Sequence, residues 1–334
     1  MPSIDYSIVI CTYNPDERLL KRCLQAVDNL DKEGLTIEVI IVDNNSAVPV
    51  SSLPSVKAYA QKLPALTIIN EREQGVNHAR IAAIDKARGK YTVYFDYDNE
   101  PEEDYLQALE KLHEQYPDVA AWGPGHVWVD FLDGIDKAIE KYARNLFQER
   151  HEEKITFAKE PEWQPCYPYG TGLCTATFLL KEYVALARQG RFTLSGRKGN
   201  LLTSGEDTQM VLICIHEGYA AGVSPTLKLK HIIPGNRANH TYVVRLIYGT
   251  GICYETCVVQ VFPEYVEQLQ KKKISEAKFI RRSLKKYIKA QWSRDPDDEF
   301  SLVSYIASIS GVYLALNKPI PSLINRITNS LKVG

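Results

Sequence analysis

The first 122 residues alternate short β-rich runs with stretches of helical periodicity, an order that few folds accommodate. Strands separated by helices pair in parallel, and the helices cover both faces of the sheet. The run 36–42 is nearly all apolar, as a strand covered on both faces should be. Apolar residues recur at helical spacing between the first two runs, at Leu19, Leu20, Cys23, Leu24, Val27 and Leu30. The sequence therefore predicts an α/β fold with strands at 7–13, 36–42, 66–70, 91–95 and 119–122.

Two carboxylates follow the fourth of these strands, in the tripeptide Asp96-Tyr97-Asp98. A D-x-D at the end of a strand in an open α/β sheet points its oxygens into the crevice where ligands bind. Mg²⁺ and Mn²⁺ prefer oxygen ligands, so the pair predicts a metal–diphosphate site. The alternative is a pair of solvated loop residues, because any two aspartates around one residue match the pattern.

Polar residues also follow the first two strands and open a helix predicted at 76–88. Thr12 and Asn14 follow the first strand, Asp43 follows the second, and Arg80 lies in the first turns of the helix. Taken singly, Asp43 begins a turn, Thr12 and Asn14 cap a helix, and Arg80 is a surface residue. Because the carboxyl ends of parallel strands meet at one edge, their joint order instead favours a shared ligand crevice.

Charge is strongly segregated along the chain. The net charge is −1, yet residues 268–294 contain ten Lys and Arg against one acid, Glu276. An apolar stripe in this region predicts a basic amphipathic helix over 264–294, with Ala277, Ile280, Leu284, Ile288 and Trp292 facing one way. The following stretch, 300–316, has no charged residue and is at the lower limit for a membrane span, which favours a packed or interfacial helix.

The seven cysteines form no C-x-x-C pair, and several lie in apolar stretches. Free thiols in such settings pack as small hydrophobic groups, which predicts a reducing, cytoplasmic compartment. The N-terminus runs directly into the first strand without a basic and apolar leader, so we expect no signal peptide.

Together these motifs resemble the family 2 glycosyltransferases of the GT-A fold, over roughly residues 5–250. The resemblance rests on residues 7–14 (SIVICTYN), residues 39–46 (VIIVDNNS), Gly75 to Arg80, the D-x-D and Gly205-Glu206-Asp207. It implies a Rossmann-like, mostly parallel central sheet flanked by helices. Residues 1–122 would bind the nucleotide sugar and 123–262 the acceptor, while 263–334 would form a basic, helical C-terminal extension.

The resemblance also implies how the donor is bound. Thr12, Asn14 and Asp43 would hold the nucleotide base and ribose. Asp43 would accept a hydrogen bond from a ring N–H, which suits uracil or thymine and favours UDP or dTDP. Arg80 would approach the base or the diphosphate. The family often carries acidic or serine residues where Asn44 and Asn45 stand here, a departure that weakens the inference about the base.

The remaining implied roles concern the metal and the chemistry. Asp96 would contact the ribose or a metal-bound water, and Asp98 would ligate the divalent cation, Mn²⁺ or Mg²⁺, that bridges the phosphates. Asp207 would be the catalytic base, although the sequence around it is also a normal acid-rich helix start. His231 would be a further metal or diphosphate contact that suits Mn²⁺, or else a structural histidine.

Two further arginines and several aromatic residues are candidates for substrate contacts. Arg237 and Arg245 are placed to clamp phosphate oxygens. The acceptor half also contains aromatic side chains, some of which would stack on sugar rings while most belong to the core, at Trp122, Trp128, Trp163, Tyr167 and Tyr169.

The resemblance implies an inverting, metal-dependent glycosyltransferase that moves one sugar to a hydroxyl of a glycan or polyprenyl-linked acceptor, in surface polysaccharide or glycoconjugate biosynthesis. The Q-x-x-R-W motif of processive members is absent, which implies single additions. A nucleotidyltransferase or dinucleotide oxidoreductase would need a glycine-rich loop after the first strand, where the chain has Thr12-Tyr13-Asn14-Pro15. The remaining alternative is a catalytically silent nucleotide-sugar-binding or scaffold protein, against which the intact acidic pairs argue.

The basic segment 264–294 leaves two interpretations open. It could rest on anionic lipid headgroups at the inner face of the cell membrane, or pack its apolar stripe against the catalytic domain with its charges in solvent. No recognisable nucleic-acid module accompanies the charges, so we expect no nucleic-acid partner.

Overall fold

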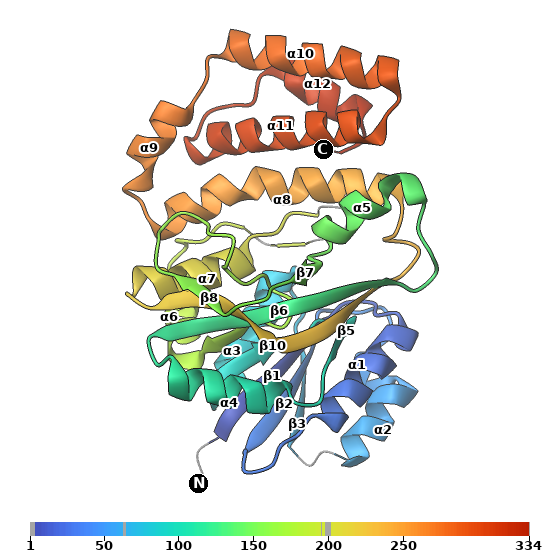
Figure 1. The fold of residues 1–334 in the computed structure, drawn as a ribbon, viewed down its shortest axis with the longest axis vertical. Coiled ribbons are helices and arrows are strands. Elements are labelled where there is room, and N and C mark those ends of the chain that lie inside the picture. The colour runs from blue at the N-terminus through green and yellow to red at the C-terminus, as the bar shows by residue number, and fades with distance from the viewer. Residues whose placement is uncertain (1–3, 63–64, 195, 198–201, 334) are drawn as a thin grey trace.

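The computed structural model describes residues 4–62, 65–194, 196–197 and 202–333. Within these residues one sheet of ten strands is flanked by helices, and further helices are stacked beyond it (Figure 1). The strands are β1 (Ile4–Thr12), β2 (Ile37–Asp43), β3 (Leu66–Asn70), β4 (Gly89–Tyr94), β5 (Asn99–Pro101), β6 (Val119–Phe131), β7 (Arg150–His151), β8 (Thr156–Ala158), β9 (Cys174–Ala176) and β10 (Ala220–Ile233).

The helices fall into two groups, one around the sheet and one towards the C-terminus. Those around the sheet are α1 (Glu17–Asn29), the 3-10 turn η1 (Val50–Ser52), α2 (Pro54–Lys62), α3 (Val76–Lys86), α4 (Tyr105–Gln115), α5 (Lys137–Leu146), α6 (Thr177–Arg188) and α7 (Glu206–His216). Those towards the C-terminus are α8 (His240–Val261), α9 (Tyr265–Lys272), α10 (Glu276–Ser293), α11 (Pro296–Ala315) and α12 (Ser322–Ser330).

The strand order is β3-β2-β1-β4-β9-β6-β10-β5, with β7 paired to β6 and β8 paired to β10. The first four strands of this order are all parallel. β9 runs antiparallel to β4 and to β6, whereas β6 and β10 are parallel to each other. The predicted α/β architecture, with a mostly parallel sheet flanked by helices, is confirmed.

Apolar side chains of β1 alternate between the two faces of the sheet. Ile8 and Ile10 join one buried cluster with α1, α2 and α4, while Val9 joins another with α3, α6 and α7. Alternation follows from the two-residue repeat of a strand. Because helices cover both faces, the polar residues after the strands collect at the carboxyl edge, where the sheet opens.

Strand β6 is longer than predicted, because it continues beyond Trp122 to Phe131 and pairs with β10 along its length. Glycines at 123 and 125 read as a strand end in the sequence. In the structure a Cβ on Gly125 would lie 2.6 Å from the Ser224 carbonyl carbon. Glycine here allows β10 to approach closely rather than ending the strand.

The predicted single helix over 264–294 is wrong, because the segment forms two helices. α9 ends at Lys272, and α10 begins at Glu276. Ser275 caps α10, with its hydroxyl accepting a hydrogen bond from the Lys278 backbone N–H. A serine outside the helix competes for backbone hydrogen bonds and fixes a new N-terminus.

The predicted apolar stripe is confirmed as a packing face only in part. Ile280 and Leu284 pack, partly buried, against a cluster of apolar side chains shared with α11 and α12. The most buried side chains of α10, Phe279, Ser283 and Ala290, lie outside the stripe. Ile288 and Trp292, assigned to the stripe, are 66% and 88% exposed. The helix therefore presents two large apolar residues to solvent among its basic side chains.

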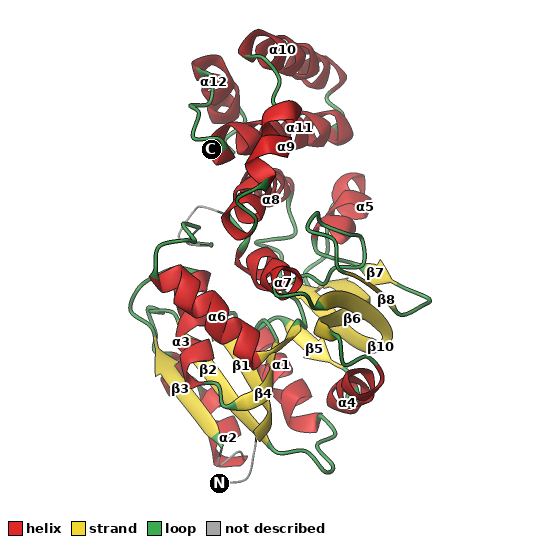
Figure 2. Ribbon diagram, turned by 90° about the vertical axis from the view of Figure 1, so that its left-hand side faces the viewer, coloured by secondary structure: helices red, strands yellow, loops and turns green. Residues whose placement is uncertain are grey.

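The uncharged stretch after residue 300 lies in α11, which packs between α8 and α10 and buries Phe300, Leu302 and Ile306. The expectation of a packed helix is thus confirmed. In the part of the chain that the structure describes, no helix is long and apolar enough to cross a membrane. Figure 2 shows α8, α11 and then α10 with α12 as successive layers above the sheet.

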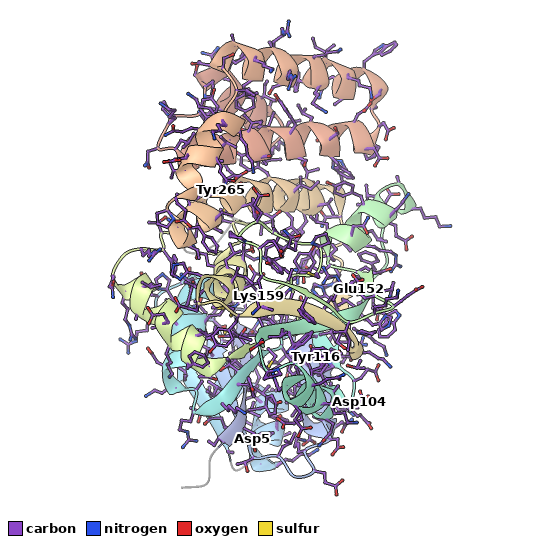
Figure 3. All side chains as sticks on the ribbon, turned by 60° about the vertical axis from the view of Figure 1, so that its left-hand side comes forward. Asp5, Asp104, Tyr116, Glu152, Lys159 and Tyr265 are labelled. Atoms are coloured by element: carbon purple, nitrogen blue, oxygen red, sulfur yellow. The ribbon has the colours of Figure 1, made fainter. Side chains whose placement is uncertain are left out.

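The predicted domain boundary at residue 262 coincides with the end of α8. Because α8 packs both against α7 before this boundary and against α11 after it, the division into two domains stays a prediction. The segment between β8 and β9 lies beside this junction. Figure 3 labels Lys159 of that segment between the sheet and Tyr265 of α9.

Candidate active site

A cavity of about 330 Å³ opens at the carboxyl edge of the sheet. Its size falls in the range of small-molecule sites. Six of the eight predicted site residues line it, drawn from strand ends, from α3 and α7, and from β10: Thr12, Arg80, Asp96, Asp98, Asp207 and His231. The convergence expected from the sequence is present for these six side chains.

Asp98 meets His231 because β5 pairs with β10. In that antiparallel pair Asn99 lies opposite His231. The neighbouring Asp98 thereby comes close to His231, with 3.7 Å between Asp98 Oδ2 and His231 Nε2. Arg237, from the loop after β10, donates to the same oxygen of Asp98. Burial of Asp98 opposes its ionisation, but His231 and Arg237 outweigh burial and hold the pKa of this carboxyl well below its usual value.

The pKa of Asp96 is shifted in the opposite direction from that of Asp98. Burial, and then the neighbouring charge of Asp98, raise its pKa, while Arg80 and His231 act in the other direction. The two carboxyls of the D-x-D are thus in different electrostatic environments. Asp98 is the one held ionised in the absence of any ligand.

His231 is oriented for a cation. Its Nδ1 lies 2.8 Å from the backbone oxygen of Phe147, an acceptor, so Nδ1 carries the proton in the neutral ring. A protonated Nε2 attracts the Asp98 carboxylate, whereas an unprotonated Nε2 offers its lone pair to a cation beside that carboxylate. No group of three or more acid, histidine or cysteine side chains suited to a metal occurs among the described residues.

Arg80 and Glu206 form an ion pair across the cavity wall. Their side chains are 6% and 5% exposed, and Arg80 Nη1 lies 3.3 Å from Glu206 Oε1. Burial raises the pKa of Glu206, as does Asp207, while Arg80 offsets part of the effect. Arg80 also lies over the ring of Tyr94 at 5.4 Å. The pair fixes the first turn of α7 to α3.

Asp207 occupies the first turn of α7, after Gly205, whose φ of 152° favours glycine. Its Oδ2 accepts a hydrogen bond of 3.0 Å from the Gly170 N–H, and the side chain is half-buried. A Cβ on Gly170 would come within 2.8 Å of that same oxygen, so only glycine leaves room there.

Asn14 and Asp43 are the two predicted residues that do not line the cavity. Both bind backbone amides of the loop after β2: Asn14 Oδ1 accepts from Ala47 N–H at 2.8 Å, and Asp43 accepts from Ser46 and Val50 N–H at 2.9 Å. Their direct contact with a nucleotide stays a prediction. In this structure they shape the loop that borders the cavity.

The cavity lining also includes residues that the sequence did not single out for a site, among them Asn44, Gln148 and Arg197. Asn44 accepts from Gly75 N–H at 2.8 Å and donates to the Glu73 carbonyl at 2.7 Å, holding the entry to α3. Of these residues Asn44 could have been found from the sequence, because an asparagine directly after a strand often hydrogen-bonds nearby backbone in a turn.

Several buried polar atoms around the cavity find no hydrogen-bond partner in the described residues: Thr12 Oγ1, Arg80 Nη1, Gln148 Oε1 and Arg237 Nε. Buried polar groups are rarely left unpaired in proteins. Their concentration here indicates that the cavity is built for a polar ligand.

The model of the family described as "Glycosyl transferase family 2" matches residues 7–173, half of the chain. The chain belongs to this family. Its enzyme class is accordingly glycosyltransferase, in agreement with the resemblance seen in the motifs.

Relatives of known name are distant. An uncharacterized glycosyltransferase of Methanocaldococcus jannaschii is 23% identical over 70% of this chain and 72% of its own length. A cholesterol galactosyltransferase of Borreliella burgdorferi is 29% identical, over 31% of this chain and 27% of its own length. Among solved structures, a mannosyltransferase from Pyrobaculum calidifontis in complex with GDP-Man and Mn²⁺ has a TM-score of 0.50 at 18% identity, covering 98% of this chain and 79% of the other. It shows that the two glycosyltransferases share a fold.

We expect Arg80→Met to destabilise this glycosyltransferase by about 3 kcal/mol, because it leaves Glu206 buried without its cation. Urea unfolding followed by circular dichroism measures the loss. Arg188→Met is the matched control, since that side chain is 61% exposed and its surface pair should change stability by less than about 0.5 kcal/mol. Equal stability of Arg80→Met and the unaltered protein would show that the pair contributes nothing.

Proposed function

We propose that this protein is an inverting, metal-dependent glycosyltransferase that adds one sugar at a time. The donor is a nucleoside-diphosphate sugar, with UDP or dTDP favoured, and the acceptor is a hydroxyl of a glycan or lipid-linked molecule. The pathway would be surface polysaccharide or glycoconjugate biosynthesis, at the cytoplasmic side of the cell.

The observation that carries this proposal is the placement of Asp207 in the same cavity as Asp98 and His231. A base for the incoming hydroxyl and a cation site for the leaving diphosphate are the two halves of an inverting transfer. An enzyme needs both within reach of one sugar. A nucleotide-binding scaffold would not need a base for an incoming hydroxyl.

Asp98 and His231 would hold the divalent cation, and the cation would neutralise charge on the departing diphosphate. Arg237 pairs with the Asp98 oxygen in the ligand-free protein, and its buried Nε is unpaired within the described residues. Guanidinium binds phosphate oxygens well, so Arg237 has a second partner when a diphosphate arrives. Arg80, which lines the same cavity, is a second candidate for the diphosphate.

In the reaction the acceptor hydroxyl oxygen forms a bond to the anomeric carbon of the donor sugar. The bond from that carbon to the diphosphate oxygen breaks, and its electron pair leaves with the nucleoside diphosphate. The hydroxyl proton passes to Asp207. Attack opposite the leaving group inverts the configuration.

The preference for uracil or thymine rests on Asp43. Each of its oxygens accepts one backbone N–H, and a carboxylate oxygen has capacity for a second hydrogen bond. These two hydrogen bonds fix the loop beside the cavity. A nucleotide base bound against this loop would donate its ring N–H to the Asp43 carboxylate. Thr12 and Asp96, both in the cavity lining, would contact the ribose.

Calorimetric titration with UDP, dTDP, GDP and CDP, each with and without Mn²⁺, tests the donor proposal. We expect UDP or dTDP to bind at least about tenfold more tightly than the others, since one hydrogen bond to a charged group is at stake. Mn²⁺ should strengthen binding in the natural protein but not in Asp98→Asn, with the exposed Asp104→Asn as control. Binding of no nucleotide would favour the scaffold alternative.

Replacement of the base should separate chemistry from binding. We expect Asp207→Asn to lower kcat by about 100- to 10,000-fold while UDP affinity stays within about twofold. Glu217→Gln, at the exposed end of the same helix, is the control and should leave kcat unchanged. Full activity of Asp207→Asn in a donor-consumption assay would disprove the assignment of the base.

A membrane partner for the C-terminal extension also belongs to the proposal. The exposed face of α10 carries Lys278, Arg281 and Lys285 together with Ile288 and Trp292 at helical spacing. Figure 1 shows α10 as the outermost element at the end opposite the N-terminus. Cations around an exposed tryptophan suit the interface of an anionic bilayer, which would bring the enzyme to a lipid-linked acceptor.

Flotation with vesicles of phosphatidylserine and phosphatidylcholine tests this surface. We expect salt-sensitive association that the double variant Arg281→Ala/Lys285→Ala weakens by about 30-fold. The exposed pair Lys137 and Lys141 on α5, both changed to alanine, is the control and should have no effect. Association that is absent, or that resists salt, would remove the membrane proposal.

A further inference from the structure

A second cavity, of about 530 Å³, adjoins the first. Both cavities are lined by residues of α7, its preceding loop, α5 and α8, and the shared residues are Leu146, Gln148, Ser204, Asp207 and Thr250. Asp207 thus faces two spaces. If the first holds the donor, a hydroxyl in the second can approach the same carboxylate.

The two cavities differ in charge. Arg80, Arg197 and Arg237 line the first, as suits a diphosphate. Of the described residues that line the second, none is Lys, Arg or His, and Asp207 is the one charged group. Among the described lining residues an anionic acceptor group would meet no cation, and it would be repelled by Asp207.

Two stacked aromatic rings form one wall of the second cavity. Trp163 and Tyr169 have ring centroids 5.8 Å apart at an interplanar angle of 26°. The Arg150 guanidinium lies 5.0 Å from the centre of the Tyr169 ring. The backbone N–H of Trp163 donates a hydrogen bond of 3.1 Å to Tyr254 Oη. The rings are therefore held in place from β7 and from α8. A flat, fixed aromatic surface packs against the C–H face of a sugar ring.

Gln148 supplies a polar group at the border of the two cavities. Its backbone has φ of 71°, a strained conformation for a residue other than glycine. Its side-chain Oε1 is buried and finds no donor within the described part of the chain. A ligand hydroxyl would satisfy this acceptor. Gln148 lines both cavities, so its side-chain amide lies at their border.

We infer that the second cavity is the acceptor site and that it takes a neutral saccharide, stacked on Trp163 and Tyr169, hydrogen-bonded to Gln148, with a free hydroxyl at Asp207. The inference rests on the proposed function and narrows its acceptor. The saccharide portion of a lipid-linked acceptor meets these requirements. A phosphate or uronate group at this position does not.

Methyl glycosides of glucose, galactose, mannose and N-acetylglucosamine are suitable probes, with glucose 6-phosphate and glucuronic acid as anionic counterparts. UDP and Mn²⁺ are titrated first and then kept saturating while each sugar is titrated by saturation-transfer NMR. At least one neutral glycoside should bind, more tightly than the anionic sugars. Trp163→Ala and Gln148→Ala should each weaken it about tenfold, and Trp163→Ala, which changes a residue outside the first cavity, should leave UDP affinity unchanged within about twofold.

Trp128→Ala is the matched control, because Trp128 is a 40% exposed tryptophan on β6 that lines neither cavity. Tyr169→Ala keeps the test valid if Trp163→Ala does not fold. The inference is overturned if anionic sugars bind better, if UDP displaces the glycoside, if the cavity variants bind as the control does, or if no glycoside binds. When no nucleoside diphosphate binds, the proposed function fails and this inference with it; normal UDP binding confines the failure to the acceptor site.

Discussion

The antiparallel pairing of β5 with β10 is the contact on which the rest of the site depends. It places Asn99 opposite His231, and the Ile232 N–H donates to the Asp98 carbonyl at 2.8 Å. The backbone of the D-x-D is thereby joined to a strand that lies more than 120 residues later in the chain. Without this pairing the Asp98 carboxylate would be buried without His231 and Arg237, at a cost of several kcal/mol. The segment that follows β4 and the end of β10 are therefore held together by backbone pairing and by charge.

Opposing charges explain why the empty cavity holds its shape. Asp96, Asp98, Glu206 and Asp207 all line it, and four carboxylates in one crevice repel one another. Arg80 pairs with Glu206 and Arg237 with Asp98, and the buried Nε of Arg237 has no hydrogen-bond partner within the described residues. The arginines thus stabilise the ligand-free fold, and Arg237 retains capacity for a phosphate oxygen. A diphosphate would add negative charge to an already acidic crevice, which favours the divalent cation proposed at Asp98 and His231.

The sequence predicts the parallel strands and the residues at their carboxyl ends, because local patterning decides both: apolar runs form covered strands, and a D-x-D after such a run faces the crevice. It could not place Glu206 beside Arg80, since that contact joins residues far apart in the chain. It also could not show that Asn14 and Asp43 bind loop amides. For α10 it placed part of the packing face wrongly, because Phe279, Ser283 and Ala290 are buried while Ile288 and Trp292 face solvent. Amphipathic periodicity identifies a helix but does not reveal which face its neighbours cover.

Asp207 stands at a boundary between a space lined by arginines and one whose described lining has none. Its Oδ2 accepts a hydrogen bond from the Gly170 N–H, which fixes the carboxylate at this boundary. In the proposed reaction Asp207 accepts the proton of the acceptor hydroxyl, and negative charge develops on the leaving group. The arginines on one side would act on that leaving group, whereas the described lining of the other side offers an anionic acceptor no cation. The proposed separation of charge would thus suit a diphosphate on one side and an uncharged hydroxyl compound on the other.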